Sequence, residues 1–322
     1  MARRALGPAT LTVVQAVEAA LVPADRLLLV ACSGGPDSLA LAAAVVHVGR
    51  RRELPIGAIV VDHGLQPSST DQAAAAGSTL RVLGYADVLV RSVVVESTGA
   101  GPEADARAAR HRALDRAAAD RGATVLLGHT RDDQAENVLL GLARGSGTRS
   151  LAGMAVRSGP GGRRVRPLLG LSRSVTVEAC GENGLVPWQD PHNLDASFTR
   201  VRARHRVLPV LEAELGPGVA DALARTALLA RDDADLLDAL AAEADPGTAT
   251  LPCGEVDELP AALRRRVLVR WLRREGLADL AAGHLFAVDA LLTDWHGQVG
   301  VDLPRRVRVR RVSGSLEVQR GG

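Results

Sequence analysis

The first 144 residues alternate between short apolar runs and longer helical stretches, and this alternation limits the fold more than any other feature. The apolar runs cover residues 26–32, 54–61, 86–95 and 124–128, and helical patterns cover 39–51, 70–83, 103–121 and 132–144. Strands that alternate with helices at short intervals form parallel sheets. We therefore predict an α/β, doubly wound parallel sheet, which binds its ligands at the carboxyl ends of the strands.

The pattern changes after residue 150. Residues 158–166 are rich in glycine and arginine and indicate a loop, and Leu215-Gly216-Pro217-Gly218 is the best candidate for a domain boundary. Residues 219–244 and 259–294 look mainly helical, and 301–318 predict two strands around a Ser-Gly turn. We predict a domain over 1–215 and a smaller, mainly helical domain over 216–322 that ends in a β-hairpin.

Composition sets further limits. Aromatic residues make up only 2%, so alanine, valine and leucine must build the core. The sequence contains no lysine, and all 39 basic residues are arginines, which keep their charge and can fork onto phosphate. The net charge of +2 neither requires nor excludes nucleic acid. Three scattered cysteines suit a reducing cytosol, and no uncharged stretch is long enough to span a membrane, so we expect a cytoplasmic protein.

The sequence Ser33-Gly34-Gly35-Pro36-Asp37-Ser38 lies between the first predicted strand and the first helix after it. Glycines allow close backbone approach, and a helix N-terminus offers unpaired N–H groups, so this loop favours phosphate. Asp37 would repel an anion unless a cation lies between them, and Mg²⁺ bound to the phosphates supplies one. An ordinary strand-to-helix turn with capping residues is the less favoured alternative for the six residues together.

This hexapeptide resembles the SGGxDS signature of the PP-loop ATP pyrophosphatases. Those enzymes have a Rossmann-like sheet, cleave ATP between the α- and β-phosphates and transfer AMP to a substrate oxygen. The resemblance implies that ATP binds at the loop with Mg²⁺ at Asp37. The Gly-Lys-Ser/Thr ending of a Walker A loop is absent here.

Two further segments resemble one branch of that family, the tRNA(Ile)-lysidine synthetases. Residues 61–65, VDHGL, follow the second strand, and the resemblance places Asp62 and His63 in the adenosine pocket, although a polar turn is equally consistent with the spacing alone. Glu103, Arg107 and Arg110 share one helix face, and a solvated surface pair is the usual meaning of such spacing. The match to E-x-x-A-R-x-x-R-Y instead implies that Arg110 points at phosphate or the activated base.

Residues 128–137, GHTRDDQAEN, carry the strongest resemblance, to the family's H-x-x-DDQAET. Capping accounts for Thr130 and Asp133 but not for the histidine and further acids beside them. Carboxylates one helical turn apart would bind the ammonium groups of free L-lysine. The resemblance implies a lysine site at Asp132, Asp133 and Glu136, and His129 or a nearby carboxylate as proton acceptor.

Later segments, 144–147, 151–154, 166–169 and 190–209, also match the family, although Val201 stands where it has asparagine. By spacing alone, alternate arginines over 200–206 form a solvated face or a phosphate-contact stripe. Together with the basic loop at 158–166, this clustering of arginines favours tRNA contacts by Arg166, Arg200 and Arg204. The family resemblance covers residues 26–210, and residues 301–318 resemble the end of the family's tRNA-binding domain.

These resemblances imply a ligase that joins lysine to C2 of the wobble cytidine in the CAU anticodon of tRNA(Ile), through an adenylate, and so makes lysidine. Asp37, Arg110 and His129 would be catalytic, ATP and Mg²⁺ would be required, and a homodimer is left open. A PP-loop tRNA thiolase is the nearest alternative, but no C-x-x-C pair occurs. A non-catalytic ATP-binding sensor is the other alternative, and it would not need Asp37, His129, Asp133 and Glu136 together.

Overall fold

The computed structural model describes residues 5–62, 64, 69–97, 101–145, 147–277 and 280–321, without the side chains of Pro102, Glu103 and His192. The expectations for His63 and for the Glu103 side chain therefore lie outside the described residues. The chain divides into a large unit, residues 1–137 and 154–224, and a small unit, residues 138–153 and 225–322. The expected boundary at residue 215 stays a prediction about domains.

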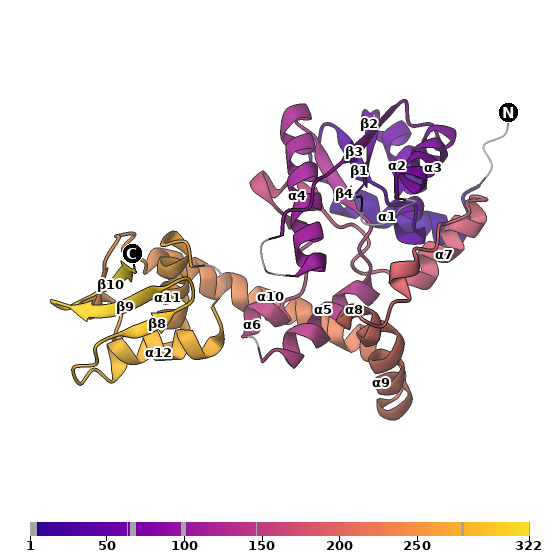
Figure 1. Ribbon diagram of the computed structural model, residues 1–322. Coiled ribbons are helices and arrows are strands. Elements are labelled where there is room, and N and C mark those ends of the chain that lie inside the picture. Colours follow the sequence, from indigo (N-terminus) through magenta and orange to yellow (C-terminus); the bar gives the residue numbers. More distant parts are fainter. Residues whose placement is uncertain are drawn as a thin grey trace. The chain divides into compact units, whose positions relative to one another are not determined.

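A six-stranded sheet forms the centre of the large unit, and its order is β3-β2-β1-β4-β6-β5 (Figure 1). The first five strands in that order run parallel, and β5 pairs antiparallel with β6. The doubly wound parallel sheet is thus confirmed. The strands are β1 (Leu28–Ala31), β2 (Ile56–Asp62), β3 (Asp87–Ser92), β4 (Thr124–Leu127), β5 (Arg157–Ser158) and β6 (Arg164–Val165).

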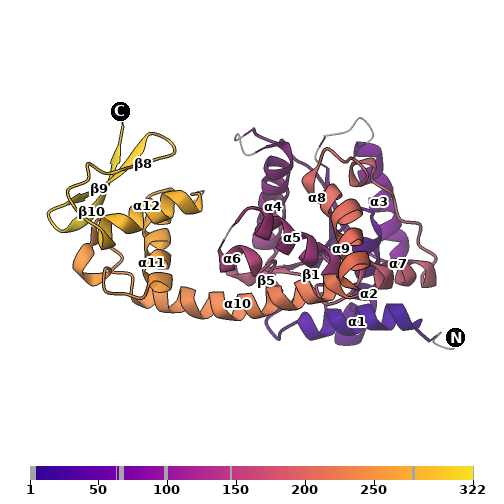
Figure 2. The same cartoon turned by 90° about the horizontal axis from the view of Figure 1, so that it is seen from below.

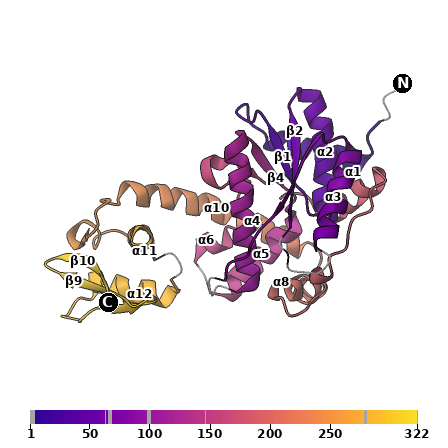
Figure 3. The same ribbon diagram turned by 45° about the horizontal axis from the view of Figure 1, so that its top comes forward.

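Helices cover both faces of this sheet, as Figure 3 shows. Side chains of β1 alternate between the faces: Leu28 and Val30 pack in one apolar cluster, and Leu29 packs with Leu114 in another. Alanine, valine and leucine dominate both clusters, as the low aromatic content requires. One face carries α1 (Pro8–Ala20), α2 (Pro36–Arg52), α3 (Ser69–Leu83) and α7 (Arg173–Glu182), and the other carries α4 (Pro102–Arg121).

The strand order reverses direction at β1, which pairs with β2 on one side and with β4 on the other. The loops that follow β1 and β4 therefore leave the same edge of the sheet at adjacent positions. A crevice at such a switch point is where open α/β sheets bind ligands. The phosphate-loop sequence follows β1, and the GHTRDDQAEN segment follows β4 and opens α5 (Arg131–Ala143).

Residues 158–166 do not form the expected loop but a small hairpin. Backbone pairing of Arg157 with Val165 and of Ser158 with Arg164 joins β5 to β6, and β6 adds to the edge of β4. Each strand has two residues, too few for a periodic pattern to appear in the sequence. The large unit is completed by α8 (Thr199–Arg202), a π-turn over Ala203–Val207 and α9 (Leu208–Leu215).

The small unit packs helices against a four-stranded antiparallel sheet of order β7-β10-β9-β8 (Figure 2). The expected hairpin is confirmed: Ser313 and Gly314 have φ of 48° and 81°, as a tight two-residue turn requires. The hairpin pairs with two further strands that the sequence did not reveal. The elements are α6 (Thr148–Leu151), α10 (Val219–Glu243, which begins in the large unit), β7 (Leu251–Pro252), α11 (Ala261–Arg274), α12 (Ala282–Thr293), β8 (Val301–Leu303), β9 (Val307–Val312) and β10 (Ser315–Arg320).

Trp271 is fully buried in the core of the small unit, and its indole N–H donates to the Ala249 carbonyl at 2.8 Å.

Over the described part of the chain, no helix has both the length and the apolar character needed to cross a membrane.

Candidate active site

The loop after β1 turns tightly into α2. Gly34 takes a φ of 84°, a conformation that side chains disfavour, and Gly35 precedes the helix without a capping side chain. The Ser38 hydroxyl closes the loop: it accepts the Ser33 N–H at 3.2 Å and donates to the Gly35 carbonyl at 2.9 Å. Pro36 occupies the first turn, where a missing N–H costs nothing. The first N–H groups of α2 therefore remain for an anionic ligand.

Gly128, at the end of β4, lies against the main chain of this loop. A Cβ atom at position 128 would come within 2.9 Å of the carbonyl carbon and oxygen of Asp37, which no side chain tolerates. Glycine at this position lets the segments after β1 and β4 touch through their backbones. The side chains at the start of α2 and α5 consequently meet in one place.

Asp37 is held by two residues of α7. Its Oδ1 accepts the Thr176 hydroxyl, and its Oδ2 accepts the Arg173 Nε–H at 3.2 Å. Burial raises the pKa of Asp37 above its ordinary value, although the charge of Arg173 and the hydroxyl of Thr176 act in the opposite direction. The carboxylate is therefore partly desolvated and fixed in direction.

Two acids of α5 lie next to it. Asp133 accepts the Thr130 N–H at 2.8 Å and guanidinium bonds from Arg173 at 2.9 Å and Arg204 at 3.1 Å. Glu136 is fully buried, and Arg204 binds both of its oxygens. Burial raises the pKa of Glu136; for Asp133 burial acts likewise, but Arg173 and other favourable partners outweigh it and lower the pKa.

Arg110 and His129 lie close enough for the charge of Arg110 to act on the imidazole. Burial and the charge of Arg110 hold the pKa of His129 well below its usual value, so the imidazole is neutral near pH 7. Burial, with repulsion from Arg107 and Arg200, lowers the pKa of Arg110 to about 10. Nδ1 of His129 and Nε of Arg110 are buried without a hydrogen-bond partner among the described residues. This arrangement suits a ligand that brings negative charge and polar atoms.

Two other expected site residues also lie at this edge of the sheet. Asp132 accepts the backbone N–H of Arg173 at 2.8 Å and so holds the start of α7. Asp62 is buried at the end of β2, where it accepts the Gly64 N–H at 3.0 Å and the Thr70 hydroxyl at 2.9 Å. Both carboxylates have structural partners, and their roles in lysine and ATP binding stay predictions.

The arginines expected to contact tRNA point into the protein. Arg166 is 4% exposed and donates to the Ala155 carbonyl and the Ser158 hydroxyl, and its role in tRNA binding stays a prediction. Arg200 donates to the Asn137 side chain at 2.8 Å. Residues 199–207 are helical, so alternate arginines do not form one stripe; Arg204 instead faces the α5 acids.

Arg173 and Thr176 were missed by the sequence analysis. They lie 136 and 139 residues from Asp37 along the chain, and no local motif links them to the phosphate loop. Their only sequence clue was that both fall in a helical segment shortly after residues 166–169, which match the family.

Two buried cysteines flank the loop. The Cys32 sulfur lies 3.5 Å from the Ser38 hydroxyl oxygen, and the Cys180 thiol donates to the Pro36 carbonyl at 3.3 Å. Burial raises the pKa of both thiols, that of Cys180 to about 11. Neither is therefore a ready nucleophile, which weighs against sulfur transfer.

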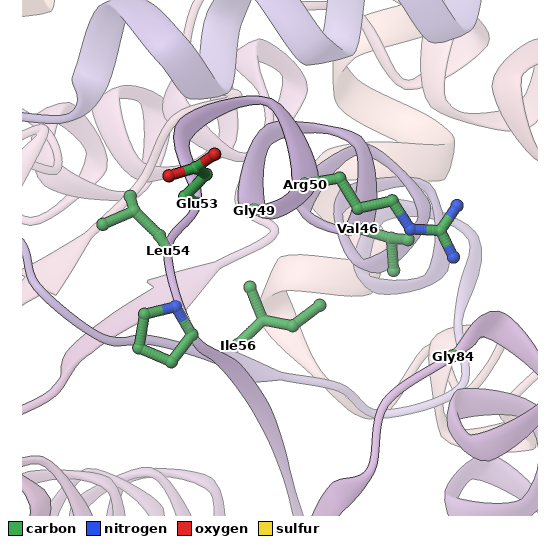
Figure 4. Close-up of a pocket in the computed structure, with 8 residues that line it drawn as sticks. Val46, Gly49, Arg50, Glu53, Leu54, Ile56 and Gly84 are labelled. Carbon is green, nitrogen blue, oxygen red and sulfur yellow. The ribbon is translucent and has the colours of Figure 1, made fainter.

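A shallow hollow lies elsewhere, between the end of α2 and the start of β2, where Figure 4 shows Glu53, Leu54 and Ile56 among its lining residues. It opens at the amino ends of the strands, the edge opposite the phosphate loop. Its lining offers Arg50 and Glu53 but none of the expected site residues. We therefore assign it no part in the site.

The number of side-chain ligands at the site limits which metal ion it can bind. No group of three or more histidine, cysteine or acidic side chains is arranged as a metal site in the described part of the chain. Asp37 alone, beside a loop built for phosphate, suits Mg²⁺, which commonly uses one or two carboxylates and takes its other ligands from phosphates and water.

Comparisons with known proteins agree with this geometry. A PP-loop domain model matches residues 10–211, and a model of the TilS substrate binding domain matches residues 251–317. A tRNA(Ile)-lysidine synthase of Thermobifida fusca is 51% identical, with 92% of this chain and 93% of the relative aligned. One of Streptomyces coelicolor is 50% identical, with 93% and 87% aligned.

A solved structure of the U34-tRNA thiolase NcsA from Methanococcus maripaludis superposes with a TM-score of 0.57 over 70% of this chain and 80% of that chain. At 16% identity, that likeness supports the fold alone. The two relatives align over 93% and 87% of their own length. The chain therefore belongs to the tRNA(Ile)-lysidine synthase family of PP-loop proteins.

Proposed function

We propose that this chain is an ATP-dependent, AMP-forming ligase that joins L-lysine to C2 of the wobble cytidine in the CAU anticodon of tRNA(Ile). One observation carries the proposal: the phosphate-loop carboxylate, Asp37, and the α5 acids, Asp133 and Glu136, meet at the switch point. A site for nucleotide activation thus adjoins a site for a cationic amine. We assign catalysis to residues 1–215, tRNA binding to 216–322, and the reaction to the cytoplasm.

In the first step, the N–H groups at the start of α2 bind the β- and γ-phosphates of ATP. The C2 oxygen of the cytidine attacks the α-phosphorus, the bond to the bridging oxygen breaks, and pyrophosphate leaves. Asp37 would hold Mg²⁺, which neutralises charge on the phosphates when bound. Arg110, buried and without a partner at Nε among the described residues, is placed to stabilise the developing negative charge.

In the second step, the ε-amine of lysine attacks C2 and AMP leaves. Asp133 and Glu136 bind and orient the amine substrate. An ammonium with a pKa of about 10.4 must lose a proton before it attacks. His129, whose Nδ1 has no partner among the described residues, or the Glu136 carboxylate, whose pKa burial raises, would accept that proton. Entry of the cytidine requires that the base leave its stack in the anticodon loop.

The test is a reconstitution with purified protein, Mg·ATP and a CAU-anticodon tRNA, with and without labelled lysine. We expect labelled lysine to enter the tRNA in step with AMP release, and a tRNA with a CAA anticodon to remain unlabelled. ATP turnover that ignores both lysine and tRNA would instead support a nucleotide sensor. Transfer of sulfur without lysine would support a thiolase.

A further inference from the structure

Arg173 occupies the place between the ATP site and the amine site. Its Nε lies 3.2 Å from Asp37, its Nη2 lies 2.9 Å from Asp133, and its Nη1 lies 4.0 Å from Glu136. Among the described residues, it is the only cation that lies within ion-pair distance of all three acids. A guanidinium in this position links the carboxylate assigned to the nucleotide with the two assigned to the amine.

Charge counting shows what this position does. Asp133 and Glu136 carry two negative charges and pair with Arg204 and with Arg173, which shares its own charge with Asp37. A lysine molecule with a net charge of +1 therefore meets acids that already have guanidinium partners. If Arg173 leaves, the two acids and Arg204 carry a net charge of −1, which matches the incoming amine. Asp133 Oδ1 already accepts hydrogen bonds from both Arg173 and Arg204, so a lysine ammonium must displace one of them to bind there.

Binding of Mg·ATP supplies a reason for Arg173 to leave. Asp37 exchanges its guanidinium partner for the divalent cation, and the triphosphate offers several oxygens to a forked guanidinium. The main chain at Arg173 need not move, because its N–H stays bound to Asp132 at 2.8 Å. The Arg173 side chain is 24% exposed, so rotation about its own bonds suffices.

Resting on the proposed function, we infer that Arg173 couples the two substrates: it fills the amine site until ATP binds and then turns to the phosphates, so that lysine binds after ATP. Arg204, bound to both oxygens of Glu136, stays and keeps the acids in place. Arg173 thereby acts as a positioning residue that sets the order of binding. It also keeps free amines out of a site that has no nucleotide to activate.

The inference is tested by calorimetric titration of L-lysine with and without Mg²⁺ and α,β-methylene-ATP, whose α–β bond cannot be hydrolysed. We expect the nucleotide to lower the Kd of lysine about tenfold, within the usual range of coupling between two sites. In Arg173→Gln, lysine alone should bind more tightly than to the native protein, and the ratio of the two Kd values should approach one.

Arg163→Gln is the matched control. The Arg163 side chain donates to the Ala118 carbonyl at 3.3 Å and forms no ion pair with the three site acids among the described residues, so this variant should keep the native ratio. Arg173→Lys guards against a folding defect. The lysine ammonium lacks the planar fork of a guanidinium, so this variant should retain only part of the native ratio of the two Kd values.

A native ratio of one, with both ligands bound, would overturn the inference and leave the proposed function intact. A full native ratio in Arg173→Gln or in Arg173→Lys would overturn it as well. If the native protein binds neither ligand, the proposed function fails, and the inference fails with it.

Discussion

The two units of the molecule hold their buried acids in opposite ways. In the small unit, Asp289 accepts guanidinium bonds from Arg264 at 2.6 Å and Arg265 at 2.8 Å, two cations for one acid. At the candidate site in the large unit, three carboxylates share two guanidinium groups among the described residues.

The pKa directions of Asp37, Glu136 and Asp289 follow this difference, whereas the pKa of Asp133 is lowered because Arg173 and its other partners outweigh burial. Burial raises the pKa of Asp37 and Glu136 more than their arginines lower it. Burial also raises the pKa of Asp289, but the hydrogen bonds from Arg264 and Arg265 lower it by more, so the pKa lies below its usual value. An excess of cations thus marks a structural cluster, and an excess of acids marks a place where a cationic ligand is expected.

The largest effect should come from Asp37→Asn. Loss of the carboxylate removes the assigned metal ligand but keeps the size of the side chain, so AMP release should fall about 10³-fold, in line with several kcal/mol of metal-assisted charge stabilisation. The measurement is lysine-dependent AMP formation at saturating substrates. Asp115→Asn, which breaks the 3.1 Å pair with Arg164 away from the site, is the control. Retained activity in Asp37→Asn would remove Asp37 from the metal role.

Glu136→Gln should raise the KM for lysine between about 10- and 100-fold, because a charge-assisted hydrogen bond contributes about 1.5–3 kcal/mol. Pyrophosphate release in the first step should change little, since Glu136 is assigned to the amine and not to ATP. Steady-state rates over a range of lysine concentrations measure the effect. An unchanged lysine KM would show that the amine binds elsewhere.

Asp289→Asn should affect stability. Two guanidinium groups would lose their shared acid, and we expect a loss of about 2 kcal/mol in the free energy of unfolding, below the range for fully buried pairs because Arg265 is 40% exposed. Urea unfolding followed by tryptophan fluorescence measures it. A loss below about 0.5 kcal/mol, the range of ordinary surface changes, would contradict the structural assignment of this cluster.

The smallest effect concerns pH. Asp289 has a lowered pKa, so its contribution is present above the unfolded value of 3.8 and is lost as pH falls through the lower folded value. Glu136 has a raised pKa, so stability is lost as pH rises from 4.5 through the folded value. Each slope is at most about 1.4 kcal/mol per pH unit. Between pH 3 and 7, the urea midpoint should therefore rise less with pH in Asp289→Asn than in the native protein, and rise more in Glu136→Gln. Identical pH profiles of the two variants would contradict the comparison.

The sequence was sufficient for the features that repeat or that lie in one continuous segment. Apolar runs and helical spacing predicted β1 to β4 and the helices between them, and the hexapeptide at residue 33 and the segment at 128 located both halves of the site. It could not reveal β5 to β8, whose two or three residues in each strand lack a periodic pattern.

The sequence also could not predict contacts between residues that lie far apart along the chain. The contacts of Arg173 and Thr176 with Asp37 depend on how α7 packs against α1 and α2, which no local spacing encodes. Arginines 200 and 204 illustrate the same limit. Charge suggested that both contact RNA, which stays a prediction, but no local spacing revealed that their side chains bind Asn137 and Glu136 of α5.

The contact of Gly128 with the Asp37 main chain has a consequence for redesign. The loop after β1 and the segment that leads into α5 touch at a point where even one methyl group does not fit. A redesign that shifts the start of α5 would therefore also displace the loop after β1. Under the proposed function, acceptance of a different amine must come from changes to side chains on α5 and α7, with Gly128 kept.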